Sequence, residues 1–160
     1  MPIFTPKTVK TDSSDGSNNP CGPYSALRFS DSGDLTQFGA FVETLPPGSK
    51  SSVKHWHTEE DEMVYMLSGT ALLHEGDTVT PMQPGDAATF KAGAPAGHCI
   101  ENGSDTDASY LVIGTRSSKE VVTYPDDDRM LKWDKINDTR EWTDHAGNPA
   151  SNPYRLSDNG

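Results

Sequence analysis

The sequence is poor in cysteine, in basic residues and in long apolar runs, and each shortage excludes a class of protein. Among 160 residues there are two cysteines, Cys21 and Cys99, which is too few for a disulfide scaffold. The 13 lysines and arginines stand against 24 aspartates and glutamates, and the net charge of −11 makes nucleic acid and anionic membranes poor partners. No apolar run approaches the ~20 residues of a membrane span. Met1–Thr5 lacks the basic and then apolar pattern of a secretory signal, so we expect a cytoplasmic protein.

Apolar residues are also scarce, and their distribution divides the chain into three parts. Hydrophobic residues make up 32% of the sequence, which is low for a domain of this length. Residues 1–23 are rich in Thr, Ser, Asp, Asn and Pro, and the C-terminal tail has a similar composition. We therefore expect an extended or disordered segment at 1–23, one folded domain at 24–125, and a short helix with a tail at 126–160. That helix is predicted for Asp126–Ile136.

Short strand-like stretches, separated by glycine and proline turns, run through the middle of the chain. Leu35–Leu45 alternates between apolar and other residues, as a strand with one buried face does. Met63–Leu67 is apolar on both faces, so we expect the chain's own N-terminal strand or a second subunit to cover its outer face. Because helix signals are weak, the pattern predicts an all-β protein, an antiparallel barrel or jelly roll.

Three histidines and an acid stand at spacings that suit a metal ion. His55 and His57 are two positions apart, so in a strand their side chains point to the same face. Glu62 opens the next strand-like run, and His98 opens a third that ends at the hairpin signal Asn102-Gly103. Three strands that meet on one inner face would therefore bring together three nitrogen donors and one oxygen donor.

This donor set predicts one bound divalent transition metal. Imidazole and carboxylate ligands suit Zn, Fe, Mn, Ni and Cu alike, so the identity of the metal stays open. Four protein ligands leave one or two positions for water or substrate on a metal that prefers five or six, as in a Lewis-acid or an oxygen-activating centre. Glu62 is the leading acid because it begins an apolar strand, and Glu60 and Asp61 are the alternatives. The competing interpretation of these acids is a charged, solvated turn.

The same residues stand in two motifs, and with them the chain resembles a cupin. The first motif is Gly48-(x6)-His55-x-His57-(x4)-Glu62-(x6)-Gly69, and the second runs from Pro84-Gly85-Asp86 to His98-(x3)-Asn102. The gap after Gly48 is one residue longer than the common cupin pattern, and the loop before His98 is also longer. The two motifs cover residues 48–102, and flanking strands extend the likeness to about 25–125.

The resemblance implies a fold and a ligand set but no particular reaction. The expected fold is the double-stranded β-helix, or jelly-roll barrel, of the cupins. The expected metal ligands are His55, His57, Glu62 and His98. Cupins of this length that are described as similar to sugar-phosphate isomerases resemble the chain further, at Gly114–Arg116 and Tyr124–Asp126.

An enzyme that moves protons beside such a metal needs a second titratable group near the open position. Glu43, at the end of a strand that leads toward the ligand strand, and Tyr110, on a core strand, are the two catalytic candidates. Their competing interpretations are a surface carboxylate and a core aromatic side chain. Tyr65 is out of phase with Glu62, so we expect it to point away from the metal.

Three functions fit these observations. The first is a Lewis-acid isomerase or lyase that acts on an oxygenated, anionic small molecule, because the net positive charge of the metal suits an anionic substrate. The second is a dioxygenase that uses the same ligands for a redox metal, and the third is a non-catalytic metal- or ligand-binding protein. The metalloenzyme class is favoured because no attached domain could read out a bound ligand, although the fold itself does not specify a function.

Two apolar segments of the sequence indicate that the chain associates with a second copy of itself. Cupins commonly dimerise by exchanging N-terminal strands, and the apolar Leu27–Phe29 and Met63–Leu67 surfaces would suit such an exchange. We therefore expect a homodimer.

Overall fold

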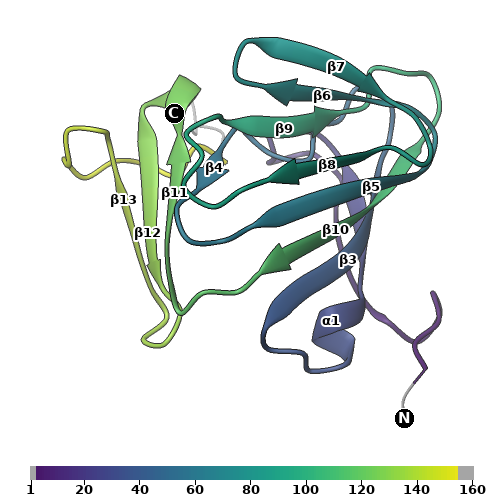
Figure 1. Ribbon diagram of the computed structural model, residues 1–160, viewed down its shortest axis with the longest axis horizontal. Helices are drawn as coiled ribbons and strands as arrows, with labels where there is room; N and C mark the ends of the chain where they lie inside the picture. The colour runs from purple at the N-terminus through teal and green to yellow at the C-terminus, as the bar shows by residue number, and fades with distance from the viewer. Residues whose placement is uncertain (1–2, 155–160) are drawn as a thin grey trace.

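Antiparallel strands make up nearly all of the regular structure in the computed structural model, which describes residues 3–154 (Figure 1). The largest sheet has six strands, in the order β1 (Lys10–Ser14), β2 (Tyr24–Arg28), β3 (Phe38–Leu45), β10 (Ala108–Thr115), β5 (Glu62–Ser68) and β8 (Ala87–Phe90). A three-stranded sheet has the order β7 (Thr78–Met82), β6 (Ala71–Glu75) and β9 (His98–Glu101). The predicted all-β antiparallel barrel is confirmed.

A third sheet stands at one end of the barrel, on the left in Figure 1. Its four strands follow the order β13 (Thr139–Thr143), β12 (Arg129–Asp134), β11 (Lys119–Tyr124) and β4 (Trp56–His57). The two-residue strand β4 therefore joins the C-terminal strands to the barrel segment that carries two of the predicted ligands. The one α-helix of the described residues is the single turn α1 (Phe29–Ser32), and it is far too short to cross a membrane.

The hydrophobic core lies between the six-stranded and the three-stranded sheet. Val64, Met66 and Tyr110 enter it from the larger sheet, and Leu73 and Ile100 enter it from the smaller one. On β5, β6 and β10 the core residues alternate with exposed or half-buried ones, so the two-residue period decides which side chains of these strands form the core, whereas β9 is buried on both faces at His98–Ile100.

The predicted helix at Asp126–Ile136 is wrong. A single 3₁₀ turn, η1 (Pro125–Asp127), ends at Asp128, whose φ of +52° is left-handed, and the strand β12 follows at once. Within β12 Leu131 is buried and Trp133 is half-buried on the same face, two residues on. Pairing with β11 on one side and β13 on the other supplies the backbone hydrogen bonds that a helix would have made internally.

The chain before residue 24 and after residue 143 is partly built into the fold. Lys10–Ser14 form β1, which pairs with β2 at the edge of the six-stranded sheet. Near the other end, Tyr154 contacts Tyr124 with ring centroids 5.8 Å apart. The parts of the predicted tails at residues 1–2 and 155–160 lie outside the described residues.

Two glycines with left-handed φ angles offer a matched test of how tightly the hairpins pack. Gly69, between β5 and β6, has a φ of +70°, and a Cβ there would lie 2.3 Å from the Asp107 carbonyl oxygen. Gly76, between β6 and β7, has a φ of +53°, and a Cβ there would meet nothing within 4 Å in the described part of the chain. The two positions therefore share the backbone requirement for glycine but differ in available space.

We expect Gly76→Ala to cost about 1 kcal/mol of unfolding free energy, because only the left-handed backbone is strained. Gly69→Ala should cost at least about 3 kcal/mol, because the backbone of Asp107 must also move. Urea unfolding of both variants and of the unmodified protein measures the difference. Equal losses in the two variants would show that the close approach at Gly69 relaxes without cost.

Candidate metal centre

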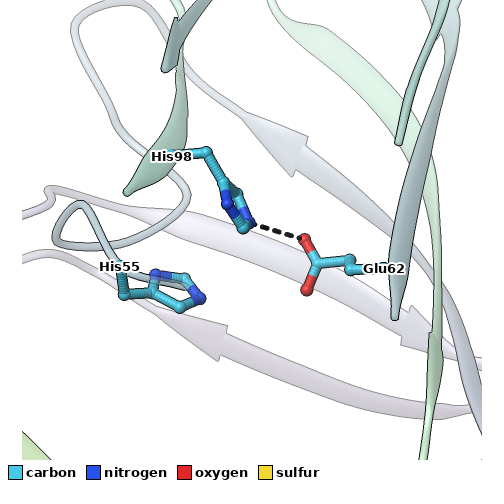
Figure 2. A group of neighbouring side chains, drawn as sticks. All are labelled: His55, Glu62 and His98. Carbon is cyan, nitrogen blue, oxygen red and sulfur yellow. Dashed lines mark ion pairs between the residues drawn. The ribbon is translucent and has the colours of Figure 1, made fainter. Parts of the chain in front are cut away.

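Three separate strands bring the predicted ligands to one end of the barrel interior. His55 directly precedes β4, and its backbone exchanges two hydrogen bonds with His98 at the start of β9, with N–O distances of 3.2 and 2.8 Å. His57 lies two residues farther along β4, and Glu62 opens β5. Figure 2 shows the side chains of His55, Glu62 and His98 converging from these segments.

The four side chains approach one another closely enough to bind one ion. His98 Nε2 lies 3.5 Å from Glu62 Oε1, and His55 Nε2 lies 3.1 Å from His57 Nε2. His57 Nε2 is also 3.9 Å from Glu62 Oε2. Two nitrogens that bind one ion at about 2.1 Å lie roughly 3.0–3.4 Å apart, depending on the coordination geometry, so the spacing of the first two histidines suits a shared ion.

The protonation of the histidines also suits a metal. His55 Nδ1 donates to the Val53 carbonyl at 2.9 Å, which leaves the lone pair on Nε2, the nitrogen that faces the cluster. Burial, together with the neighbouring His57 and His98, lowers the pKa of His55 to about 4, so its ring is neutral at neutral pH. Among the described residues His98 Nε2 is buried without a hydrogen-bond partner, and a bound metal ion would accept its lone pair.

Glu62 is the acid that joins the cluster, and the two alternatives are engaged elsewhere. Burial opposes its ionisation, but the close approach of His98 Nε2 and the electrostatic effect of the neighbouring histidines outweigh that effect and lower the pKa of Glu62. Glu60 accepts a hydrogen bond from the Ser117 amide at 2.7 Å and forms an ion pair with Lys135. Asp61 accepts from the Ala92 amide at 2.8 Å. The group His55, Glu62 and His98 could therefore hold a cation, with His57 beside it.

The ring of His98 is held in place by stacking. Phe90, the last residue of β8, lies parallel to it, with ring centroids 3.6 Å apart and an interplanar angle of 3°. Because the imidazole cannot rotate without losing this contact, Nε2 stays directed at Glu62.

A cavity of about 210 Å³ adjoins the cluster, and both predicted catalytic residues line it together with His55, Glu62 and His98. Tyr110 donates a short hydrogen bond from its hydroxyl to Glu43 Oε2. The two residues face each other directly in the register of β10 and β3, with their side chains on the barrel interior. The structure thus places both candidates beside the cluster, and neither is on the surface.

The environment of Glu43 shifts its titration toward neutral pH. Burial raises the pKa of this carboxyl to about 7, the hydrogen bond from Tyr110 opposes the rise, and the nearby charge of Glu62 adds to it. Arg28 and Asp12 act from farther away, the first lowering and the second raising the pKa of Glu43. The pKa of Tyr110 is raised well above its usual value, first by burial and then by Glu43, so its hydroxyl stays protonated and able to donate.

A second, more open cavity of about 550 Å³ lies next to the first, because Phe41, Glu62 and Val112 line both. Three cationic side chains line it, those of Arg28, Arg116 and Lys135. Each of these cations has an acidic partner, because Arg28 lies 2.6 Å from Asp12, Arg116 pairs with Asp31, and Lys135 pairs with Glu60.

Sequence reasoning missed Glu120, which lies behind His57. Its carboxyl oxygen Oε2 is 4.0 Å from His57 Nδ1, and its side chain is 1% exposed. The available signal was an acid on the buried face of an alternating strand, because Glu120, Val122 and Tyr124 are all buried along β11.

Comparison with known proteins identifies relatives over nearly the whole chain. The cupin-domain family model matches residues 41–114, which include the four predicted ligands, Glu43 and Tyr110. A crystal structure named as a sugar phosphate isomerase of the cupin superfamily, from Silicibacter pomeroyi, is 34% identical with a TM-score of 0.83, and the match covers 97% of this chain and 100% of that one. A candidate sugar phosphate isomerase from Acidithiobacillus ferrooxidans is 27% identical with a TM-score of 0.81, over 94% and 96% of the two chains.

One curated relative carries a different description. An oxalate-binding protein from Thermotoga maritima is 35% identical over 69 residues, which is 43% of this chain and 54% of that protein. The alignment therefore spans about half the length of this relative.

The raised pKa of Glu43 predicts a pH-dependent loss of stability. Because its folded-state pKa of about 7 lies above the ordinary value of 4.5, folding is favoured by a protonated Glu43, and this contribution is lost as the pH rises through 7. The Glu43→Gln variant mimics the protonated carboxyl at every pH. We expect its stability relative to the unmodified protein to increase by on the order of 3 kcal/mol between pH 4 and pH 8.

Chemical unfolding of both proteins across this pH range, with excess chelator present, measures the difference. Titration of the histidines and other groups is common to both proteins and cancels in the comparison. Parallel stability profiles would show that Glu43 keeps an ordinary pKa in the folded protein.

Proposed function

The chain belongs to the cupin superfamily, and from that premise we propose that it is a metal-dependent enzyme, an isomerase or lyase that acts on a small, oxygenated, anionic substrate. One observation carries the proposal. Three members of the cluster, His55, Glu62 and His98, line the same cavity as Glu43, a carboxyl with a pKa of about 7. Such a pairing of a Lewis-acid site with a poised proton carrier is what proton-transfer chemistry beside a carbonyl requires.

We assign the metal to the four residues of the cluster, His55, His57, Glu62 and His98. Three neutral imidazoles and one carboxylate suit Zn, Fe, Mn, Ni or Cu, and the choice among these stays open. When bound, the ion would supply Lewis acidity toward an oxygen of the substrate. The buried, partnerless nitrogen of His98 and the close approach of His55 to His57 support the assignment.

Glu43 is the group that we assign to proton transfer. A carboxyl with a pKa of about 7 exists in both protonation states at neutral pH, so it can accept a proton from carbon and return it elsewhere on the substrate. Tyr110 holds the carboxyl in one orientation through its hydroxyl. The apolar walls of the cavity, which include Phe41, Val64 and Ile100, limit access of water to the pair.

The outer cavity supports an anionic substrate. The net charge of −11 works against anions at long range, so attraction must come from local cations. Arg28, Arg116 and Lys135 line the 550 Å³ cavity, and an anionic group would bind them by replacing their present acidic partners, Asp12, Asp31 and Glu60. The relatives from S. pomeroyi and A. ferrooxidans, both named as sugar phosphate isomerases, support phosphorylated sugars as the first substrates to test.

A binding protein without catalysis is the second candidate, and the oxalate-binding relative favours it. The same cluster and cavity would then hold a small dicarboxylate without moving a proton. The dioxygenase alternative and the cytoplasmic location stay predictions from the sequence.

The proposal predicts a separation of metal binding from turnover in two variants. The protein reconstituted with each candidate metal should convert at least one sugar phosphate or hydroxy acid. Glu43→Gln should keep one metal ion per chain and lower kcat at least about 100-fold, because the proton carrier is lost. His57→Ala should lose both the metal and the turnover while it remains folded. Elemental analysis, circular dichroism and a substrate screen followed by NMR measure these outcomes.

Each result distinguishes between the candidate functions or tests the role of one residue. Tight binding of oxalate or a similar acid by calorimetry, with no turnover of any substrate by the metal-loaded protein, would favour the binding protein. Full activity of Glu43→Gln would remove Glu43 from the mechanism. Metal bound at full stoichiometry in His57→Ala would remove His57 from the ligand set.

We further propose that the protein is a homodimer that associates through the outer face of the six-stranded sheet. Leu27, Val42, Leu111 and Tyr65 lie in register across four strands and form an apolar row on that face. Tyr65 is 39% exposed, and Leu67 farther along β5 is 45% exposed. In the described chain β1 pairs with β2 at the edge of the sheet and Tyr65 and Leu67 stay exposed, so we propose a second copy of the chain as their cover.

The substitution Leu67→Glu should convert the dimer to a monomer, because a carboxylate would be buried in the interface without a partner. Val79→Glu is the matched control, since Val79 is 54% exposed on β7 in a different sheet. Sedimentation velocity at micromolar concentration distinguishes the masses. A monomeric unmodified protein, or a dimer that survives Leu67→Glu, would contradict this interface.

A further inference from the structure

The structure holds a second group of potential ligand atoms, made of His57, Glu60 and Glu120, directly behind the proposed metal centre. Two of its members are committed to protein partners. Glu60 Oε1 is held by the Ser117 amide and by Lys135, whose positive charge already balances the carboxylate. Glu120 Oε1 accepts hydrogen bonds from three backbone amides. With these partners in place, the group is poorly suited to a second cation.

We propose instead that Glu120 is a positioning residue for the metal, and that its carboxylate holds the imidazole of His57 with the proton on Nδ1 and the lone pair of Nε2 toward the cluster. This inference rests on the metal site of the proposed function. Glu120 lies outside residues 41–114, the segment that matches the cupin-domain family model.

The strand pairing places Glu120 beside His57. Val122 of β11 lies directly opposite His57 of β4, and Glu120 is two residues before Val122, on the same face. Residues in this diagonal relation on paired strands are within reach of one another. The side chain of Glu120 is 1% exposed, so its carboxylate is fully enclosed at this point.

The carboxylate is rigidly anchored through one oxygen. Oε1 accepts from the amides of Thr58 at 2.9 Å, Glu59 at 3.2 Å and Val121 at 2.8 Å. Two of these amides belong to the turn that directly follows His57. The anchoring therefore fixes the carboxylate relative to the segment whose histidine it faces.

The other oxygen and the histidine are complementary. Glu120 Oε2 and His57 Nδ1 are both buried, both lack a hydrogen-bond partner in the described chain, and lie 4.0 Å apart. An acceptor of this kind tolerates only a donor, so it favours the tautomer with a proton on Nδ1. A shift of about 1 Å in either side chain closes the hydrogen bond. Metal-bound histidines usually donate their second nitrogen to such an acceptor.

The test is Glu120→Gln, which keeps the size of the side chain and reverses the group that faces His57. The amide oxygen of Gln can take the three backbone hydrogen bonds, and its NH₂ group then faces Nδ1 and favours a proton on Nε2 instead. We expect the affinity for Zn²⁺ to fall 10- to 100-fold, as measured by competition with a chromophoric chelator. Thermal unfolding of the metal-free variant should match that of the unmodified protein.

A matched control separates positioning from simple loss of charge. Glu59→Gln removes one negative charge from the neighbouring turn, at an exposed residue, and should bind Zn²⁺ like the unmodified protein. Imidazole ¹⁵N NMR of the metal-free proteins reads the tautomer directly. It should show the proton of His57 on Nδ1 in the unmodified protein and on Nε2 in Glu120→Gln.

The outcomes distinguish this inference from the proposed function. Equal Zn²⁺ affinity in Glu120→Gln and the unmodified protein overturns the role of Glu120 and leaves the metal site standing. Failure of both proteins to bind any divalent metal overturns the proposed function, and an unchanged His57 tautomer in the variant then overturns this inference separately. If Glu120→Gln does not fold, Glu120→Asp keeps the charge but withdraws the carboxylate by one methylene, and unmodified Zn²⁺ affinity in it also overturns the proposal.

Discussion

The pair of backbone hydrogen bonds between His55 and His98 is the contact on which the site depends. It joins the segment before β4 to the start of β9, two parts of the chain that are far apart in sequence. Once these two residues are paired, the two-residue period of a strand places His57 beside His55, and the short turn that follows returns the chain to β5 and Glu62. A displacement of either segment would separate two of the proposed ligands, so the barrel pairing and the geometry of the site cannot vary independently.

Two buried glutamates in this fold occupy different environments, and the difference explains their assigned roles. Glu120 receives three backbone N–H groups on one oxygen, which compensate for the burial of a negative charge. Glu43 receives a single hydroxyl, from Tyr110, and the pKa of this carboxyl rises to about 7 because that one donor does not offset burial. A buried carboxylate that accepts several hydrogen bonds suits a fixed structural charge. A buried carboxyl that accepts only one suits proton transfer. The unfolding free energy that is lost when the buried Glu43 ionises is a cost of the kind found at functional sites.

The barrel and the convergence of the ligands could be predicted from the sequence, because both follow from a two-residue period that is visible in the residues themselves. The helix at Asp126–Ile136 could not be excluded, since an acidic start followed by mixed apolar residues suits a capped helix as well as a strand. Pairing with β11 and β13 makes this segment a strand, and the residues of the segment itself do not reveal these partners. For Glu43 the missing information was the strand register, which sets it opposite Tyr110. The role of Glu120 could not be predicted from the sequence, because it accepts hydrogen bonds from backbone amides of a turn that is distant in the chain.

The C-terminal sheet gives this chain a support that a minimal barrel does not have. β11 is the strand that pairs with β4, and it brings Glu120 to His57 from outside the family-matched segment. Residues that hold the second nitrogen of a ligand histidine tune the affinity and basicity of the site, even though they never touch the ion. If Glu120 acts as proposed, a relative without this C-terminal sheet lacks the corresponding control over its histidine. A comparison of metal preference is therefore more informative with the relatives that match over the whole chain, such as the S. pomeroyi protein, than with those that match the barrel alone.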